Sequence, residues 1–183
     1  MPRRWLKSVL PDVEKYRDHS IARFLGPSFF HPALWHLNRR SVAGGVALGL
    51  FCGLIPGPLQ MFGGALGAIW FKRNLPVALV TTLYTNPLTI IPLYLVAYQL
   101  GTLVLGPSAD AITPPSYSGM TPVQWAEALG EWAASLGKPL LIGVPLLAIL
   151  LASVGYAAVH VGWGLYLRWA WSRRRATRRP VAR

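Results

Sequence analysis

Polar side chains stand beside two proline breaks in otherwise apolar sequence. Gln60 follows the break in "IPGPLQ", and Asn86 and Thr89 belong to "TNPLT". Proline lacks a backbone N–H and removes a hydrogen bond from the preceding turn, and inside a membrane the freed groups must be covered by protein or line a water-filled cavity. Two roles are therefore open for these side chains: they satisfy the loose backbone, or they line a polar site where the breaks meet. Helix N-termini starting near Leu59 and Leu88 would then suit an anion.

Charged and ionisable residues offer a second set of candidates. Arg39, Arg40 and Arg73, with Asn74, flank the first apolar stretch; they either orient the chain in a membrane or recognise phosphate or carboxylate. His160 lies inside an apolar stretch, where an ionisable side chain is a functional candidate, although a neutral, hydrogen-bonded histidine also fits there. The candidate ligand-binding residues are Pro56, Gly57, Pro58, Gln60, Asn86, Pro87, Thr89, Arg39, Arg40, Arg73, Asn74 and His160.

Groups needed for most enzyme chemistry are missing from the pattern. No Asp or Glu interrupts the apolar stretches, and no Ser/His/Asp set, carboxylate pair or phosphate-binding loop stands out. His31 and His36 are five residues apart and do not share a helical face. We therefore expect no catalytic residues, no metal site and no cofactor, and we favour a binding or transport protein over an enzyme.

The composition indicates a membrane protein. The 183 residues are 53% hydrophobic and 13% charged, whereas soluble domains are about a quarter charged. Residues 41–71, 74–109 and 139–167 contain no charge, and each stretch exceeds the ~20 residues that cross a bilayer. All but three of the 18 Lys and Arg residues (Lys72, Arg73 and Lys138) lie before or after these stretches. This net charge of +12 therefore fits cytoplasmic flanks and anionic phospholipids rather than nucleic acid.

The charge-free stretches predict how the elements position the candidates. As one helix, 41–71 would be about 46 Å long, so the break at 56–58 suggests a re-entrant hairpin with both charged ends cytoplasmic. The second stretch is broken at Asn86 and Pro87. Both stretches contain the letters "VAL" (46–48 and 77–79) followed by a proline (Pro56 and Pro87), and both pairs are 31 residues apart. Such paired breaks are typical of transporter-like sites at the membrane midplane.

A less basic segment follows and is expected on the far side. Thr121, Pro122 and Gln124 predict a capping box at a helix start. The residues Trp125, Leu129, Trp132 and Leu136 fall on one face, which predicts a short helix on the outer leaflet surface. Residues 139–167 then return as a transmembrane helix.

We therefore predict an all-α, polytopic integral membrane protein of the bacterial inner membrane, with both termini cytoplasmic. Residues 1–30 form a basic amphipathic interfacial segment. The single membrane domain, 31–167, comprises a broken hairpin (31–73), a broken helix (74–106), an extracytoplasmic loop with a short helix (107–138) and a transmembrane helix (139–167). Residues 168–183 form a basic cytoplasmic tail.

These motifs resemble a bacterial membrane family known as domain of unknown function 2062. The similarity covers roughly residues 30–165 and is carried by N-R-R-S, G-x-x-P-x-P-x-Q, R-N-x-P and T-N-P-x-T. The matched positions are Asn38, Arg39, Arg40, Gly53, Pro56, Pro58, Gln60, Arg73, Asn74, Pro76, Thr85, Asn86, Pro87 and Thr89. The resemblance implies an inner-membrane protein, and because some relatives carry glycosyltransferase-like domains, it also implies work on the envelope or on lipid-linked saccharides.

Two functions follow as hypotheses. The first is a small transporter, flippase-like or channel-like protein with a polar midplane site for an anionic solute or a lipid-linked head group. So few helices in one chain predict a homo-oligomer. The alternative is a non-catalytic scaffold for cell-envelope biogenesis proteins.

Overall fold

The structure, a computed structural model, describes residues 31–86, 88–106, 115 and 119–177. Within these residues its regular secondary structure is all helix, with no strand, which confirms the all-α prediction. The helices are α3 (Pro32–Trp35), α4 (Arg39–Cys52), α5 (Leu59–Trp70), α6 (Leu75–Thr82), α7 (Ile90–Leu105), α8 (Pro122–Ser135) and α9 (Gly137–Thr177). The predicted N-terminal amphipathic segment lies outside the described residues. Helix α9 continues well into the predicted basic tail.

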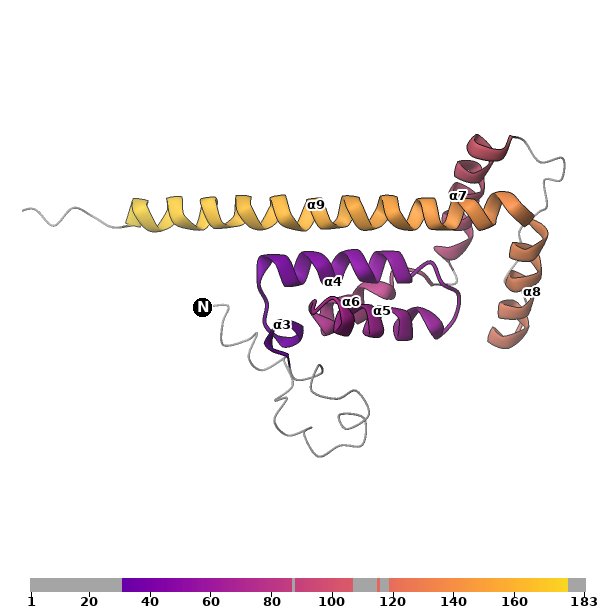
Figure 1. Ribbon diagram of the computed structural model, residues 1–183, viewed down its shortest axis with the longest axis horizontal. Helices are drawn as coiled ribbons and strands as arrows, with labels where there is room; N and C mark the ends of the chain where they lie inside the picture. The colour runs from indigo at the N-terminus through magenta and orange to yellow at the C-terminus, as the bar shows by residue number, and fades with distance from the viewer. Residues whose placement is uncertain (1–30, 87, 107–114, 116–118, 178–183) are drawn as a thin grey trace, which may run out of the picture.

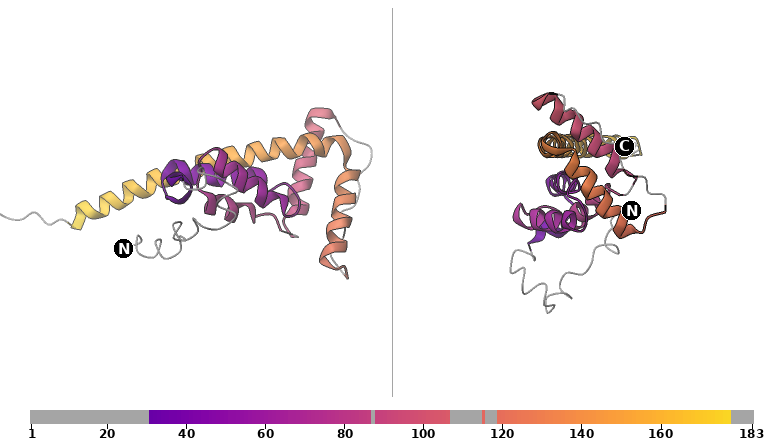
Figure 2. Two further views of the ribbon diagram at one scale, coloured as in Figure 1. Left: turned by 60° about the horizontal axis from the view of Figure 1, so that its bottom comes forward. Right: turned by 90° about the vertical axis from the view of Figure 1, so that its right-hand side faces the viewer.

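One long helix organises the arrangement. Helix α4 lies alongside α9, and α5 and α6 pack against α4 on the side away from α9 (Figure 1). Helices α7 and α8 run across the α9 axis near its N-terminal end in both views of the long axis (Figures 1 and 2). The two proline-broken segments are thus brought to the same region, beside α8.

Helices α4 and α5 form an antiparallel pair, and the turn between them is the predicted break. Helix α4 begins where the Asn38 side chain accepts a hydrogen bond from Ser41 N at 2.8 Å, a favourable N-cap. Its last helical residue is Cys52, and Gly57 then takes the left-handed conformation, φ 72°, which costs glycine little. Helix α5 starts directly after Pro58, as the fixed φ of proline favours.

The connection from α5 to α6 is an equally tight reversal. Arg73 N donates to Ala68 O at 2.8 Å and Lys72 N donates to Ile69 O at 3.3 Å, the two bonds of a Schellman motif. Lys72 occupies its left-handed position, φ 52°, where glycine is usual. Asn74 then caps α6 by accepting from Val77 N at 3.0 Å.

Small residues let α4 approach α6 backbone to backbone. A Cβ on Gly49 would lie 2.5 Å from Ala78 O, and one on Gly45 would lie 2.7 Å from Asn74 O. The close spacing therefore requires glycine on α4, as in membrane helix pairs with small residues four apart. A similar crossing joins α7 to α9, where Gly101 faces Pro139 and Gly143 faces Ala97.

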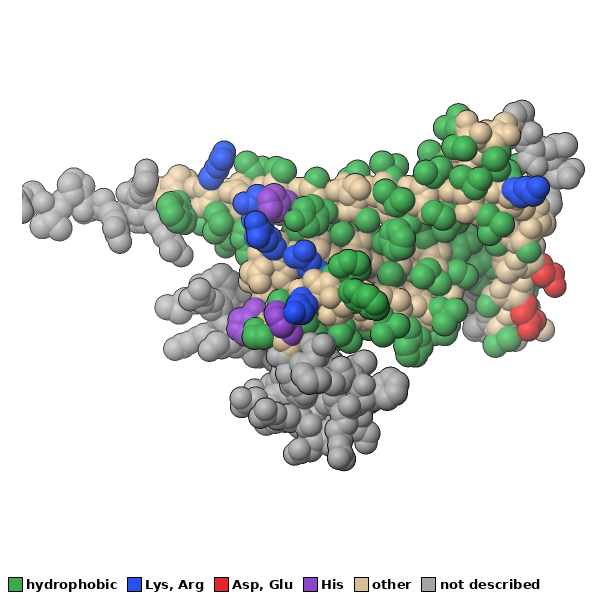
Figure 3. Space-filling model, viewed as in Figure 1, with side chains coloured by type: hydrophobic (Ala, Val, Ile, Leu, Met, Phe, Trp, Pro, Cys, Tyr) green, Lys and Arg blue, Asp and Glu red, His purple; other side chains and the backbone are tan. Residues whose placement is uncertain are grey.

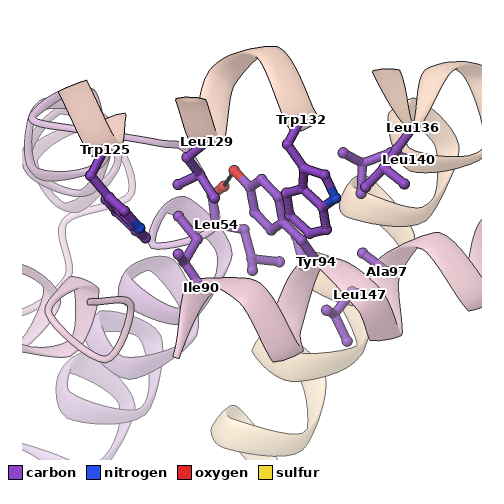
Figure 4. Packing of buried hydrophobic residues seen from close by; sticks show 11 residues of the cluster. Leu54, Ile90, Tyr94, Ala97, Trp125, Leu129, Trp132, Leu136, Leu140 and Leu147 are labelled. Carbon is purple, nitrogen blue, oxygen red and sulfur yellow. Dashed lines mark hydrogen bonds between the residues drawn. The ribbon is translucent and has the colours of Figure 1, made fainter. Parts of the chain in front are cut away.

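Helix α8 has the predicted capping box, in which Thr121 and Gln124 each bond the other's backbone N–H. Its apolar face is occupied by protein: the side chains of α8 point toward Tyr94 of α7 and Leu54 of the α4–α5 turn (Figure 4). The buried members on that face are Trp125, Leu129, Trp132 and Leu136. The prediction of a helix lying free on a leaflet surface is therefore wrong about this face, because packing inside the protein satisfies the same amphipathic pattern.

Candidate functional site

The two proline-broken segments meet through side-chain hydrogen bonds to backbone carbonyls. The hydroxyl oxygen of Thr85 lies 2.6 Å from Gly53 O and 2.6 Å from the carboxamide oxygen of Gln60. Tyr94 donates to Leu54 O at 3.0 Å, so the start of α7 is also tied to the turn. Gly53 and Leu54 sit past the end of α4, where carbonyls lack intrahelical partners. These bonds therefore satisfy the backbone that the first break exposes.

The single hydroxyl proton of Thr85 determines how the Gln60 carboxamide is oriented. The threonine hydroxyl has one proton to donate. Gly53 O is a carbonyl oxygen and can only accept, so the hydroxyl donates to Gly53 O. Oxygen and nitrogen of a carboxamide are interchangeable by rotation, so the favourable arrangement has the Gln60 amide N–H donating to the Thr85 oxygen. The Gln60 carbonyl oxygen and second N–H then remain available to a ligand.

A cavity of about 320 Å³ opens beside this junction. It is lined by Pro56, Gly57, Gln60, Thr85, Asn86, Ile90, Tyr94, Trp125, Ala126, Leu129, Gly130 and Ala133. Polar groups come from both breaks, whereas α7 and α8 supply apolar and aromatic walls. We call this cavity the junction pocket.

The walls of the junction pocket are ordered by aromatic packing. Tyr94 stacks on Trp132, with ring centroids 6.4 Å apart and planes 14° apart, and both side chains are buried. The described lining contains amides, a hydroxyl and aromatic rings but no charged side chain. This combination suits a polar, uncharged group with an apolar face, because pockets of this kind orient a ligand through a few polar contacts.

Four predicted site residues, Pro56, Gly57, Gln60 and Asn86, line the junction pocket. Pro58 caps α5, and Pro87 lies outside the described residues.

Two backbone N–H groups just before α7 are bonded by a side chain of the second break. The side-chain oxygen of Asn86 accepts from Leu88 N at 2.9 Å and from Thr89 N at 3.0 Å. Thr89 in turn donates to Tyr84 O at 2.7 Å. Asn86 Oδ1 and the Thr89 hydroxyl thus satisfy backbone groups beside the second break, and an anion site at this helix start stays a prediction.

The residues of the predicted basic rim lie close together, between the start of α4 and the start of α6. Arg73 donates to Arg40 O at 3.3 Å, and its aliphatic stem crosses α4 at Gly44. Asn74 is fully buried and donates to His36 O at 3.5 Å, so its role is structural.

Arg39 and His160 instead line a second cavity together with Arg168. Arginine and histidine side chains gather at this end of the molecule, whereas carboxylates gather at the other end, over α8 (Figure 3). Among the described residues, no three metal-ligating side chains come together.

Sequence reasoning about the site missed the other eight lining residues of the junction pocket, among them Thr85, Tyr94 and Trp125. Thr85 had a signal, because it opens the T-N-P-x-T motif. Tyr94 and Trp125 had none beyond their places on apolar helix faces, which show that a face is buried but not what it contacts.

The family comparison covers most of the chain. The family model described as an uncharacterized protein conserved in bacteria, domain of unknown function 2062, matches residues 22–172. The chain belongs to this family. The match to domain of unknown function 2062 contains both breaks, the junction pocket and Arg168. Comparison with the curated proteins and with the solved structures gave no match.

Proposed function

We propose that the chain is a multi-pass protein of the bacterial inner membrane that binds the head group of a lipid-linked saccharide in the junction pocket and helps it cross. The pocket itself carries this proposal, because both broken segments contribute polar groups to one cavity with aromatic walls. Uncharged amide and hydroxyl groups match the hydroxyls of a sugar, and aromatic faces offer apolar contact to its C–H groups.

Helix α9 supports the membrane setting. The most apolar 18-residue stretch of this helix has a mean hydropathy of 2.3, and only 22% of that stretch is buried within the protein. The core helix of a soluble domain would be mostly buried, so this apolar surface calls for lipid or another chain. The span from Lys138 to Arg168 is about 45 Å of helix, close to the ~40–45 Å of a bilayer with its head groups.

The packing of α4 supports a position of the junction pocket near mid-depth. Arg39 at the start of α4 and Arg168 of α9 line the same cavity, so they mark one surface. From there α4 runs 14 residues, about 21 Å, and Leu50 meets α9 at Gly155. The α4–α5 turn therefore lies beside the middle of the charge-free part of α9, which supports a re-entrant hairpin entering from the arginine side.

Helix α5 supports a homo-oligomer. One of its faces exposes large apolar side chains at helical spacing, namely Leu59, Phe62, Leu66 and Trp70. A second copy packed on this face would shield it and help to enclose a pathway that one chain is too small to surround.

The proposal is tested in proteoliposomes with two fluorescently labelled lipids, a glycosyl diacylglycerol and phosphatidylglycerol, by dithionite quenching of the outward-facing label. We expect the protein to expose inner-leaflet glycolipid to the quencher and Gln60→Ala to reduce that rate. Gln99→Ala makes the same change on an exposed part of α7 and should leave the rate unchanged.

Wild-type vesicles that quench no faster than protein-free vesicles would refute translocation. That result would favour the alternative of a scaffold for cell-envelope proteins. Equal rates for wild type and Gln60→Ala would show that the junction pocket is not on the path.

Cysteine labelling tests the topology separately. Arg40→Cys and Lys138→Cys, each in a cysteine-free background, should react with a membrane-impermeant maleimide from opposite sides of the membrane. Labelling of both positions from one side would contradict the arrangement.

A further inference from the structure

A second cavity, of about 510 Å³, lies where the start of α4 meets the C-terminal part of α9. It is lined by Arg39, His160, Val161, Gly164, Leu165, Leu167, Arg168 and Trp171. The junction pocket shares none of these residues. We call this cavity the arginine pocket.

The charge of the arginine pocket is uncompensated within the described residues. Arg39 and Arg168 both line it, and no carboxylate does. The carboxylates of the described chain, Glu127 and Glu131, lie on α8 at the opposite end (Figure 3). Arg39 is also the first residue of α4, so the positive end of that helix dipole adds to the field.

His160 supplies an unused hydrogen-bonding group. Its Nδ1 atom is shielded from solvent and has no hydrogen-bond partner. Its ring stacks on Tyr156, with centroids 5.7 Å apart and planes 12° apart, so its orientation is held. Because Nδ1 is shielded, a ligand in this pocket can hydrogen-bond the His160 ring only through its other nitrogen, Nε2.

The remaining lining is apolar and faces outward. Val161, Leu165 and Leu167 on α9 are exposed, as is the Trp171 ring. Two guanidinium groups beside exposed aliphatic side chains match an amphiphile with an anionic head. Tryptophan at such a boundary is typical of the membrane interface.

We propose that the arginine pocket binds the phosphate of an anionic phospholipid in the leaflet at the arginine end. Arg39 and Arg168 hold the phosphate oxygens, a contact that guanidinium geometry favours. His160 Nε2 bonds a further head-group oxygen, and an acyl chain lies along Val161 and Leu165. Only the membrane setting of the proposed function is required, not the junction pocket.

Native mass spectrometry of the purified, full-length protein in detergent tests this site. Phosphatidylglycerol should remain bound at concentrations where zwitterionic phosphatidylcholine does not. Arg39→Gln and Arg168→Gln should each weaken phosphatidylglycerol binding by about five-fold, as expected for one basic residue at a membrane surface. His160→Phe keeps a ring against Tyr156 but removes Nε2, and it should also weaken binding.

Arg40→Gln is the matched control, because Arg40 is exposed at the same end but does not line the pocket. Equal binding of the two lipids, or equal loss in Arg40→Gln and Arg168→Gln, would show general surface attraction and overturn the proposal. Inorganic phosphate provides a further arm: if it displaces the lipid at similar concentration, the pocket is a free-phosphate site and not a lipid site.

The two proposals fail separately. If the wild-type protein does not select phosphatidylglycerol but translocates glycolipid normally, the arginine pocket alone is refuted. If it selects phosphatidylglycerol but does not translocate glycolipid, the junction pocket alone is refuted. Because Arg39 and Arg168 are exposed, their glutamine variants should fold, and an unchanged circular dichroism spectrum checks this.

Discussion

Replacing Thr85 by valine tests whether one hydroxyl joins the two broken segments. Thr85 is 8% exposed, and valine keeps its shape while removing the oxygen. Gly53 O then loses its side-chain donor, and the Gln60 carboxamide loses its partner. Leaving a buried polar group unsatisfied costs about 1–3 kcal/mol. We therefore expect the free energy of unfolding to fall by about 2 kcal/mol, roughly a 30-fold change in the folding equilibrium.

Reversible unfolding in mixed detergent micelles, followed by tryptophan fluorescence, measures this loss. Thr102→Val is the matched control, because the Thr102 hydroxyl bonds only to Gln99 O of its own helix, at 2.8 Å; it should cost less than about 0.5 kcal/mol. Thr85→Ser restores the hydroxyl and should recover most of the stability.

The Thr85 reasoning fails if Thr85→Val is no less stable than Thr102→Val. It also fails if serine and valine at position 85 are equally damaging, since the hydroxyl would then have no special role. A stable Thr85→Val protein that still loses glycolipid translocation would place the hydroxyl in ligand binding instead of in the junction.

Four further substitutions test the packing around the site by the same unfolding measurement. Gly49→Ala places a Cβ 2.5 Å from a backbone carbonyl oxygen and should lower the free energy of unfolding by about 1–3 kcal/mol. The Cβ of Gly130→Ala meets nothing within 4 Å, so this change should stabilise α8 by about 0.5–1 kcal/mol. Equal effects of the two changes would contradict the tight α4–α6 contact. Asn74→Ala removes a buried N-cap and should cost about 1–2 kcal/mol, and a neutral result would mean that α6 does not depend on this cap. Lys72→Gly relieves a left-handed lysine, φ 52°, and should stabilise by about 1 kcal/mol; a destabilised variant would show that the lysine side chain itself stabilises the turn.

Local chemistry made the elements of the fold predictable. Proline lacks an N–H, and "IPGPLQ" therefore ends one helix and starts the next wherever it lies. The capping box at Thr121 is likewise a contact between residues three apart. Such features depend on short stretches, so the sequence indicates them directly, and the structure has both.

Partners across the fold were not predictable in the same way. The periodicity of α8 identifies its apolar face but not whether lipid or protein covers it, and Tyr94 proved to be the neighbour. Arg39 and Arg40 are adjacent in the sequence, whereas Arg73 lies 33 residues further on and reaches them across the fold by passing Gly44 to bond Arg40 O; of the three, Arg39 lines the cavity at the end of α9. The proximity of His160 to Arg39 depends on how α4 packs along α9, which no local pattern encodes.

The two cavities together narrow the choice of substrate. Their polar groups are separated by the length of α4, about 21 Å, so one phosphate cannot occupy both. The described lining of the junction pocket has no cation, and an unpaired phosphate buried there would cost several kcal/mol. An anionic solute is therefore disfavoured in the junction pocket relative to an uncharged saccharide head group. The labelled glycosyl diacylglycerol should consequently cross faster than phosphatidylglycerol, and the reverse order would require a cation that the pocket does not have among its described residues.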